Sequence, residues 1–337
     1  MPHVPTRKLT TVEGFVVLDL DDAPVSTGIV RSAPSILQSG AADLARSLTY
    51  SYASLGMQRG GASAGVNATD DSRPSALTAF VAEIAPLVEA GTFLPDAGKG
   101  VADDDLSALR ALDPRSPVDN RLRERLIAAG AIAAAEHACG SLEGRTVAIE
   151  GYDNAARQLV GALIDRGAKV VAVSTQKGAV LAPEGISPFE LAKGAAVVGE
   201  GADPAFKVLG APCDVLFTGS KMGAVDHKGA EFVKAKAVVP TAPIPVTAKA
   251  LAVLRRAGAF VAPDFVVLAG PLLAAWPDGG ATASAEQLEQ VTHDTVTGIL
   301  DEVATHEEGP LLGACARAEA FLGTWRPSLP FGRPLAA

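Results

Sequence analysis

The chain has 337 residues, a formal net charge of −9, 48% hydrophobic residues and 20% charged residues. This length predicts two domains with sizeable cores, and the composition is that of a globular protein rather than a disordered or fibrous one. The acidic balance, without any dense run of Lys and Arg, argues against nucleic acid or an anionic membrane surface as a partner.

Three cysteines, Cys139, Cys213 and Cys315, are widely spaced and form no CxxC or Cys/His pattern. They are typical of reduced thiols in a cytoplasmic protein rather than of a disulfide framework or a zinc site. The N-terminus "MPHVPTRKLTTVEG" lacks the apolar core of a signal peptide, and prolines and an aspartate interrupt the apolar stretch at 260–276. We therefore expect a soluble, cytoplasmic protein without a metal site or a membrane span.

The first part of the chain predicts an α/β domain over residues 1–120. An apolar β-rich run, "GFVVLDLDDAP" (14–24), ends in a turn. Apolar residues at helical spacing follow over 41–56 and lead into the glycine-rich segment 59–66. A helix is predicted over 75–90, then a strand and loop over 91–100 and a short helix with an acidic first turn over 102–112.

The second part predicts a doubly wound, Rossmann-type domain over residues 142–310. An alanine-rich helix at 121–141 is the expected connector between the domains. Short apolar strands then alternate with helices, which is typical of a parallel sheet covered on both faces. The predicted strands are 146–150, 169–173, 214–218, 236–239 and 259–262. Helices are predicted at 285–303 and 310–323, and residues 311–337 form a C-terminal helix and tail.

The turn after the first of these strands resembles a phosphate-binding turn but carries a carboxylate. It reads "GYDNAA" (151–156), with Asp153 where the second glycine of a dinucleotide turn is expected. The second strand ends in Ser174 and Thr175 without the acidic residue that binds ribose hydroxyls in NAD sites, which leaves NADP open. Asp153 either caps the following helix or contacts a phosphate or a metal. The candidate cofactor contacts are Gly151, Asp153, Asn154, Ser174 and Thr175.

A series of segments along the chain resembles one family. In order they are "LARSLTYSYASLGMQRGGASAGV", "LPDAGKG", "SLEGRTVAIEGYDNAA", "GAKVVAVS", "CDVLF", "VKAKAVV" and "AGAFVAPDFVVLAG". Together they are similar to the Glu/Leu/Phe/Val amino-acid dehydrogenase family over about residues 15–320, most of all to its shorter leucine, phenylalanine and valine type. The resemblance implies an N-terminal substrate domain, a C-terminal Rossmann domain, a cleft between them and homo-oligomers. It also implies NAD or NADP as cofactor and reversible oxidative deamination of an amino acid.

The first departures from the family's pattern lie in the substrate domain. The resemblance places the lysine that holds the substrate carboxylate at Ser51 and the catalytic lysine at Ser63. Neither hydroxyl supplies a fixed positive charge or a base that titrates near neutrality. The family's catalytic aspartate falls at Asp96, and Lys99 follows without a family counterpart. On simpler interpretations, the serines fill space, Asp96 is a turn residue and Lys99 is a solvated surface lysine.

Cofactor positions depart as well. Two asparagines that the family places near the nicotinamide fall at Pro243 and Leu268, and a threonine falls at Asp119. Three hypotheses follow. The chain is a repurposed member that binds a small molecule in the cleft, with Asp96 as acid or base. It is a pseudoenzyme that partners an active homologue. Or it is an active NAD(P)-dependent dehydrogenase in which Lys99 replaces a lost lysine. The departures favour the first two.

Overall fold

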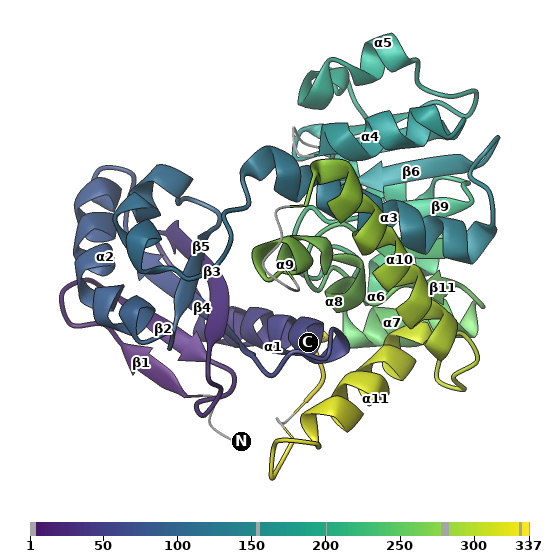
Figure 1. Cartoon of the computed structure of the whole chain (residues 1–337). Coiled ribbons are helices and arrows are strands. Elements are labelled where there is room, and N and C mark those ends of the chain that lie inside the picture. The colour runs from purple at the N-terminus through teal and green to yellow at the C-terminus, as the bar shows by residue number, and fades with distance from the viewer. Residues whose placement is uncertain (1–4, 153–155, 200, 278–282, 330–331, 337) are drawn as a thin grey trace. The chain divides into compact units, whose positions relative to one another are not determined.

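The computed structural model describes residues 5–152, 156–199, 201–277, 283–329 and 332–336 (Figure 1). The chain divides into two compact units. Unit 1 consists of Met1–Arg115 and Ala318–Pro334, and unit 2 of Ser116–Arg317 and Leu335–Ala337. Each unit contains a sheet with parallel strands and packed helices, so the predicted two-domain α/β fold class is confirmed.

Unit 1 is built on a five-stranded sheet of order β1-β2-β4-β3-β5. Strands β4, β3 and β5 are parallel, whereas β1 and β2 run antiparallel to their neighbours. The strands are β1 (Thr6–Lys8), β2 (Gly14–Leu18), β3 (Ser26–Ala33), β4 (Gly60–Asn67) and β5 (Leu94–Ala97). The sequence pattern missed β1, β3 and β4.

The glycine-rich segment therefore forms a central strand, because a helix packs closely against it. Helix α1 (Gln38–Ser54) lies over β4, and a Cβ built at Gly61 would stand 1.9 Å from the carbonyl oxygen of Ala45. Thr49 Oγ1 accepts a hydrogen bond from the Gly61 N–H at 2.9 Å. Only glycine permits this approach of helix backbone to strand.

Other segments complete unit 1. Helix α2 (Arg73–Glu89) and the 3-10 helix η1 (Asp103–Leu112) follow β4 and β5, near their predicted positions. The segment 318–334 returns to α1. There Tyr50 Oη donates to Glu319 at 2.9 Å, and Arg46 Nη1 donates to the Gly332 carbonyl at 2.6 Å.

Unit 2 is built on a six-stranded sheet of order β11-β10-β9-β6-β7-β8. All neighbours are parallel except β7 and β8, which form an antiparallel hairpin that the sequence pattern did not predict. The strands are β6 (Thr146–Glu150), β7 (Lys169–Thr175), β8 (Gly178–Leu181), β9 (Val215–Thr218), β10 (Ala237–Pro240) and β11 (Phe260–Val261). The strand order reverses between β6 and β9. In sheets of this kind, ligands bind outside the carboxyl ends of the strands at such a reversal.

The helices of unit 2 begin where polar side chains cap them. Ser284 and Gln287 form a capping box that starts α10 at its predicted residue, and Asp119 Oδ1 accepts the Leu122 N–H at 2.7 Å to start α3. Helix α3 packs on α4, α9 and α10. The helices are α3 (Asn120–Cys139), α4 (Ala156–Asp165), α5 (Pro188–Leu191), η2 (Gly194–Val197), η3 (Ala205–Gly210), α6 (His227–Phe232), α7 (Ala248–Arg256), α8 (Asp264–Val267), α9 (Gly270–Ala275), α10 (Ala285–Val303) and α11 (Pro310–Leu322). The residues of α11 from Ala318 onward belong to unit 1.

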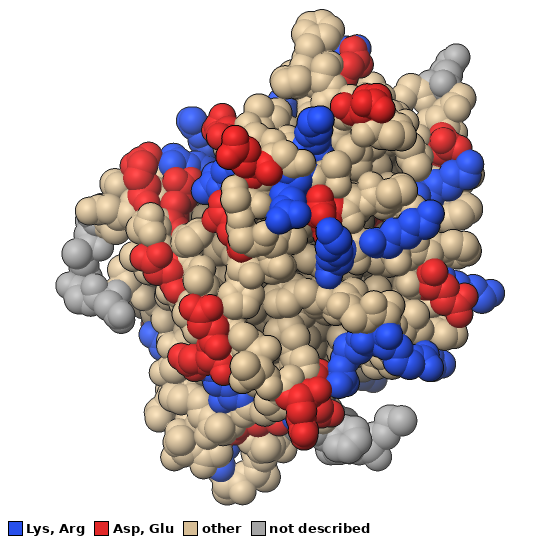
Figure 2. All heavy atoms as spheres, turned by 90° about the vertical axis from the view of Figure 1, so that its right-hand side faces the viewer, with Lys and Arg blue, Asp and Glu red and all other residues tan. Residues whose placement is uncertain are grey.

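Among the residues that the structure describes, no helix is long and apolar enough to cross a membrane, and no group of His, Cys, Asp and Glu side chains could hold a metal. All three cysteines are free thiols. Figure 2 shows Lys and Arg interspersed with Asp and Glu on the face in view.

Candidate functional site

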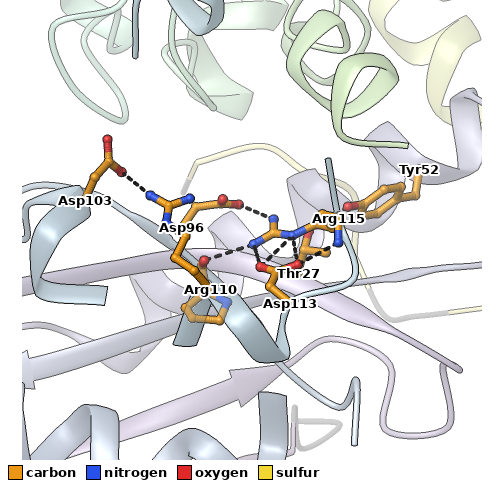
Figure 3. Close-up of polar contacts among 8 residues, drawn as sticks. Thr27, Tyr52, Asp96, Asp103, Arg110, Asp113 and Arg115 are labelled. Carbon is orange, nitrogen blue, oxygen red and sulfur yellow. Dashed lines mark hydrogen bonds and ion pairs between the residues drawn. The ribbon is translucent and has the colours of Figure 1, made fainter. Parts of the chain in front are cut away.

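Asp96, at the carboxyl end of β5, is held by an arginine (Figure 3). Arg115 Nη1 lies 2.9 Å from Asp96 Oδ2, and its Nη2 lies 2.7 Å from Asp113 Oδ2. Arg115 Nη2 also donates to the Pro95 carbonyl at 3.0 Å. The side chains of Arg115, Asp96 and Asp113 are 9%, 22% and 18% exposed, so this network is largely shielded from water.

The network fixes Asp96 as one half of an ion pair. Burial alone would lower the pKa of Arg115, but the charges of Asp96 and Asp113 and their hydrogen bonds raise it above its ordinary value. Arg115 therefore remains charged, and Asp96 keeps a permanent cation beside it. No sequence motif predicts Arg115 as a site residue, because Asp96 lies 19 positions away from it.

Ser63 lies in the same row of the sheet as Asp96. The register pairs Ser63 of β4 with Ile29 of β3, and Ile29 with Asp96 of β5. The side chain of Ser63 is fully buried, and its Oγ donates to the Ile29 carbonyl at 3.1 Å. Two positions selected from the sequence thus share one face of the sheet, although the Ser63 hydroxyl is already hydrogen-bonded to backbone.

Ser51 lies on α1, and its hydroxyl is also hydrogen-bonded within the protein. Its Oγ donates to the carbonyl of Ser47, one helical turn earlier, at 3.2 Å, and the residue is 4% exposed. This is the bond that a serine inside a helix commonly makes. Nearby, Thr27 Oγ1 and Tyr52 Oη lie 2.7 Å apart and connect β3 to α1 (Figure 3).

Lys99 lies in the loop that follows β5. Its side chain is exposed, and its carbonyl accepts the Ser32 N–H at 2.9 Å. The cation beside Asp96 is Arg115 instead.

In unit 2, the reversal of strand order carries a carboxylate that the sequence analysis missed. Glu150 ends β6, and its Oε2 accepts hydrogen bonds from Thr218 Oγ1 at 3.0 Å and from the Gly219 and Ser220 N–H groups at 3.1 Å. The Ser220 hydroxyl donates to Oε1. The donors that follow β9 are thus satisfied by the protein's own carboxylate.

The turn after β6 packs tightly against the same loop. Gly151 has a φ of 92°, and a Cβ there would stand 2.6 Å from the Ser220 nitrogen, so glycine is required. The Tyr152 N–H donates to the Ser174 carbonyl at 2.6 Å, and Thr175 Oγ1 accepts the Lys177 N–H at 3.1 Å. The predicted contacts Asp153 and Asn154 lie outside the described residues.

The two positions that resemble the family's nicotinamide asparagines belong to one hydrogen-bonded corner. Pro243 precedes Ile244, the residue with the left-handed φ of 53°. Buried Asp264 accepts the Ile244 N–H through Oδ2 at 2.9 Å, and its carbonyl accepts the Leu268 N–H at 2.9 Å. A side chain in this backbone region is strained and is held by its surroundings.

Sequence comparison with known proteins points to the family that the motifs resemble. Residues 125–276 match the model of the Glutamate/Leucine/Phenylalanine/Valine dehydrogenase family. The match covers a little under half of the chain, and over these residues the chain is similar to this family. A glutamate dehydrogenase of Aeropyrum pernix is 35% identical over 147 residues, which cover 42% of this chain and 35% of the relative. An NADP-specific glutamate dehydrogenase of Halobacterium salinarum is 32% identical over 172 residues, which cover 49% and 40%.

Solved structures share the fold over nearly the whole chain. Hetero-hexameric glutamate dehydrogenase from Thermus thermophilus, in a leucine-bound form, has a TM-score of 0.78 and 22% identity, with 94% of this chain and 87% of that chain covered. L-tryptophan dehydrogenase from Nostoc punctiforme has a TM-score of 0.68 and 18% identity, with 96% of each chain covered. In sequence, the chain spans only about a third to two fifths of the length of the curated relatives it matches.

Proposed function

We propose that this family member does not perform ordinary NAD(P)-dependent oxidative deamination and that it has been repurposed, either to bind a small molecule or to act as a pseudoenzyme partner. One observation carries the proposal. The side chains at the positions that resemble the family's two lysines, Ser51 and Ser63, are buried and hydrogen-bonded to backbone carbonyls. Neither can hold a substrate carboxylate as an ammonium does, or serve as a general base.

Asp96 supports the same conclusion. A general base must be free to take up a proton from the reacting group, and its pKa is best matched to the working pH. Asp96 instead pairs with Arg115 in a largely buried network, so its Oδ2 atom already accepts a hydrogen bond from the protein. The proposed role of Asp96 is therefore to order the end of β5, and an acid–base role would require the ion pair to open.

The part of the proposal that concerns the cofactor rests on Glu150. A pyrophosphate at the reversal of strand order needs free N–H donors, but the Gly219 and Ser220 N–H groups bond to this carboxylate. A second anion there would also meet the charge of Glu150, which costs on the order of several kcal/mol at close range. We therefore propose that the predicted NAD or NADP contacts, Gly151 in the turn after β6 and Ser174 and Thr175 at the end of β7, do not hold a dinucleotide in the usual manner.

The identity of the ligand and the assembly remain proposals. A small-molecule ligand, a homo-oligomer and a complex with an active homologue are all consistent with the family, and a cytoplasmic location agrees with three free thiols. The alternative function is an active NAD(P)-dependent oxidoreductase acting on the CH–NH2 group of an amino acid. The residue type at position 96, an aspartate as the family resemblance implies, favours this alternative, whereas the ion pair of Asp96 with Arg115 counts against it.

Binding of NADH and NADPH tests the proposal. Nicotinamide fluorescence should remain unchanged when protein is added at millimolar cofactor, and tight binding with a fluorescence shift would contradict the cofactor argument. The double variant Ser51→Lys/Ser63→Lys should also lack deamination activity, because the cofactor end departs from the family as well. Robust activity in that variant would show that the lysines alone account for the change.

A further inference from the structure

Arg31 on β3 lies on the face of the sheet that carries Ser63 and Asp96. The register pairs Arg31 with Gly65, two residues after the Ile29–Ser63 pair, and alternate residues of a strand share a face. Thr27 fixes which face this is, because its hydroxyl bonds to Tyr52 of α1. Helix α1 packs mainly over β4 and β2, so Ile29 and Arg31 on β3 keep partial exposure.

Two nitrogens of the Arg31 guanidinium are buried, and no counter-ion for it is found among the described residues. Its Nε and Nη2 atoms are buried and have no hydrogen-bond partner among the described residues. Burial lowers the pKa of Arg31 below its ordinary value, and no neighbouring charge raises it again. Arg115, in contrast, is bound by two carboxylates on the same unit.

A desolvated cation without a partner is unfavourable, and native proteins rarely leave one in that state. The two buried nitrogens of Arg31 form one edge of the guanidinium. Two parallel N–H donors on such an edge match the two oxygens of a carboxylate. A carboxylate is therefore the group that this side chain lacks.

We propose that Arg31 binds the carboxylate of a small molecule on the α1 face of the unit 1 sheet, and so supplies the positive charge that the serine at position 51 does not. This inference rests on the proposed function, because it assumes that unit 1 still holds a small molecule. It assigns that molecule to the carboxylic acids. Since Nε and Nη2 are closed to water without ligand, the side chain turns on its flexible stem when the carboxylate binds.

Calorimetric titration without cofactor tests this inference. The probes are L-leucine, L-phenylalanine and their 2-keto acids, with leucinamide as the analogue that lacks a carboxylate and inorganic phosphate as a general anion. We expect at least one acid to bind the wild-type protein and leucinamide not to bind. Arg31→Met should weaken that acid roughly tenfold to a hundredfold, the usual effect of losing charge-assisted hydrogen bonds.

A matched control separates the site from net charge. Arg7→Met removes an exposed arginine from β1 of the same sheet, and it should leave the affinity unchanged. The melting temperature of ligand-free Arg31→Met should equal or exceed that of the wild type, which shows that the variant folds and that a desolvated charge has been removed.

Three results would overturn the inference. They are equal affinity of wild type and Arg31→Met for the acid, binding of phosphate without any carboxylate, and no binding of any probe by the wild type. The first leaves small-molecule binding intact. Deamination of an amino acid by the wild-type protein would instead contradict the proposed function. The affinity of Arg31→Met for the acid would still test the role of Arg31 separately.

Discussion

Two carboxylates stand at the carboxyl ends of strands in the two units, and their partners differ. Asp96 at the end of β5 is bound by the cation of Arg115, whereas Glu150 at the end of β6 is bound by neutral donors, the Thr218 and Ser220 hydroxyls and two backbone N–H groups. In unit 1 the charge of Asp96 is paired, and a further cation, Arg31, lacks a counter-ion among the described residues. In unit 2 a net negative charge stays beside the Gly151 turn. This difference is why we propose an anion site in unit 1 and no phosphate site at the turn of unit 2.

Replacement of Arg115 in unit 1 should cause the largest loss of stability. Arg115→Met leaves Asp96 and Asp113 facing each other in a largely buried place, so we expect the free energy of unfolding to fall by about 3–5 kcal/mol. Urea denaturation measures this loss. The control is Arg110→Met, because Arg110 is 55% exposed and 3.7 Å from Asp103, and the expected change is below about 0.5 kcal/mol. Equal effects of the two variants would contradict a special role for Arg115.

Neutralising the carboxylate of unit 2 should have a smaller effect on stability but change anion binding. Glu150→Gln keeps an acceptor oxygen for some of the donors and loses the charge, so we expect a loss of about 1–3 kcal/mol. The same variant should bind NADPH or pyrophosphate more tightly than the wild type, as measured by calorimetry. An unchanged or weaker affinity would mean that Glu150 does not exclude the phosphates.

A third carboxylate, away from both sites, should give the smallest effect. Glu83 accepts hydrogen bonds from the N–H and hydroxyl groups of Thr10 and Thr11, chiefly the Thr11 hydroxyl, and they lower its pKa to about 2. Because the pKa in the folded state lies below the ordinary value of 4.5, the stabilisation is present above pH 4.5 and is lost as the pH falls toward 2.

The Glu83→Gln variant should therefore lose less stability than the wild type between pH 4.5 and 2. The difference should be roughly 1 kcal/mol or less, since the group is close to solvent. Thermal unfolding at several pH values measures it, with Glu89→Gln as a control on the same helix. Parallel pH profiles of wild type and Glu83→Gln would rule out the stabilising role of these bonds.

The parts of the fold that the sequence predicted are those with local causes. Strand β6 is a short apolar run, and α10 starts at a capping box four residues long. Strand β4 was missed because its glycines have low strand propensity, and the reason for them, the close approach of α1 to Gly61, appears only in three dimensions.

The same distinction between local and long-range causes applies to the residues of the candidate site. Asp96, Ser51 and Ser63 could be selected from the order of motifs. Arg115 and Glu150 could not, because Arg115 bonds to Asp96 19 positions away and Glu150 bonds to Ser220 70 positions away, and no spacing rule connects these residues. Arg31 could not be selected from the sequence either. Its lack of a hydrogen-bond partner among the described residues is evident only once the neighbouring side chains are placed.

We propose that the chain no longer catalyses the family's reaction, and steady-state turnover measures this catalysis itself. Purified protein is incubated with NAD+ or NADP+ and each of a panel of L-amino acids, and formation of NADH or NADPH is followed by absorbance. The account predicts no formation of reduced cofactor above the rate without protein for any pair. Amino-acid-dependent reduction that saturates with substrate and scales with protein concentration would contradict it.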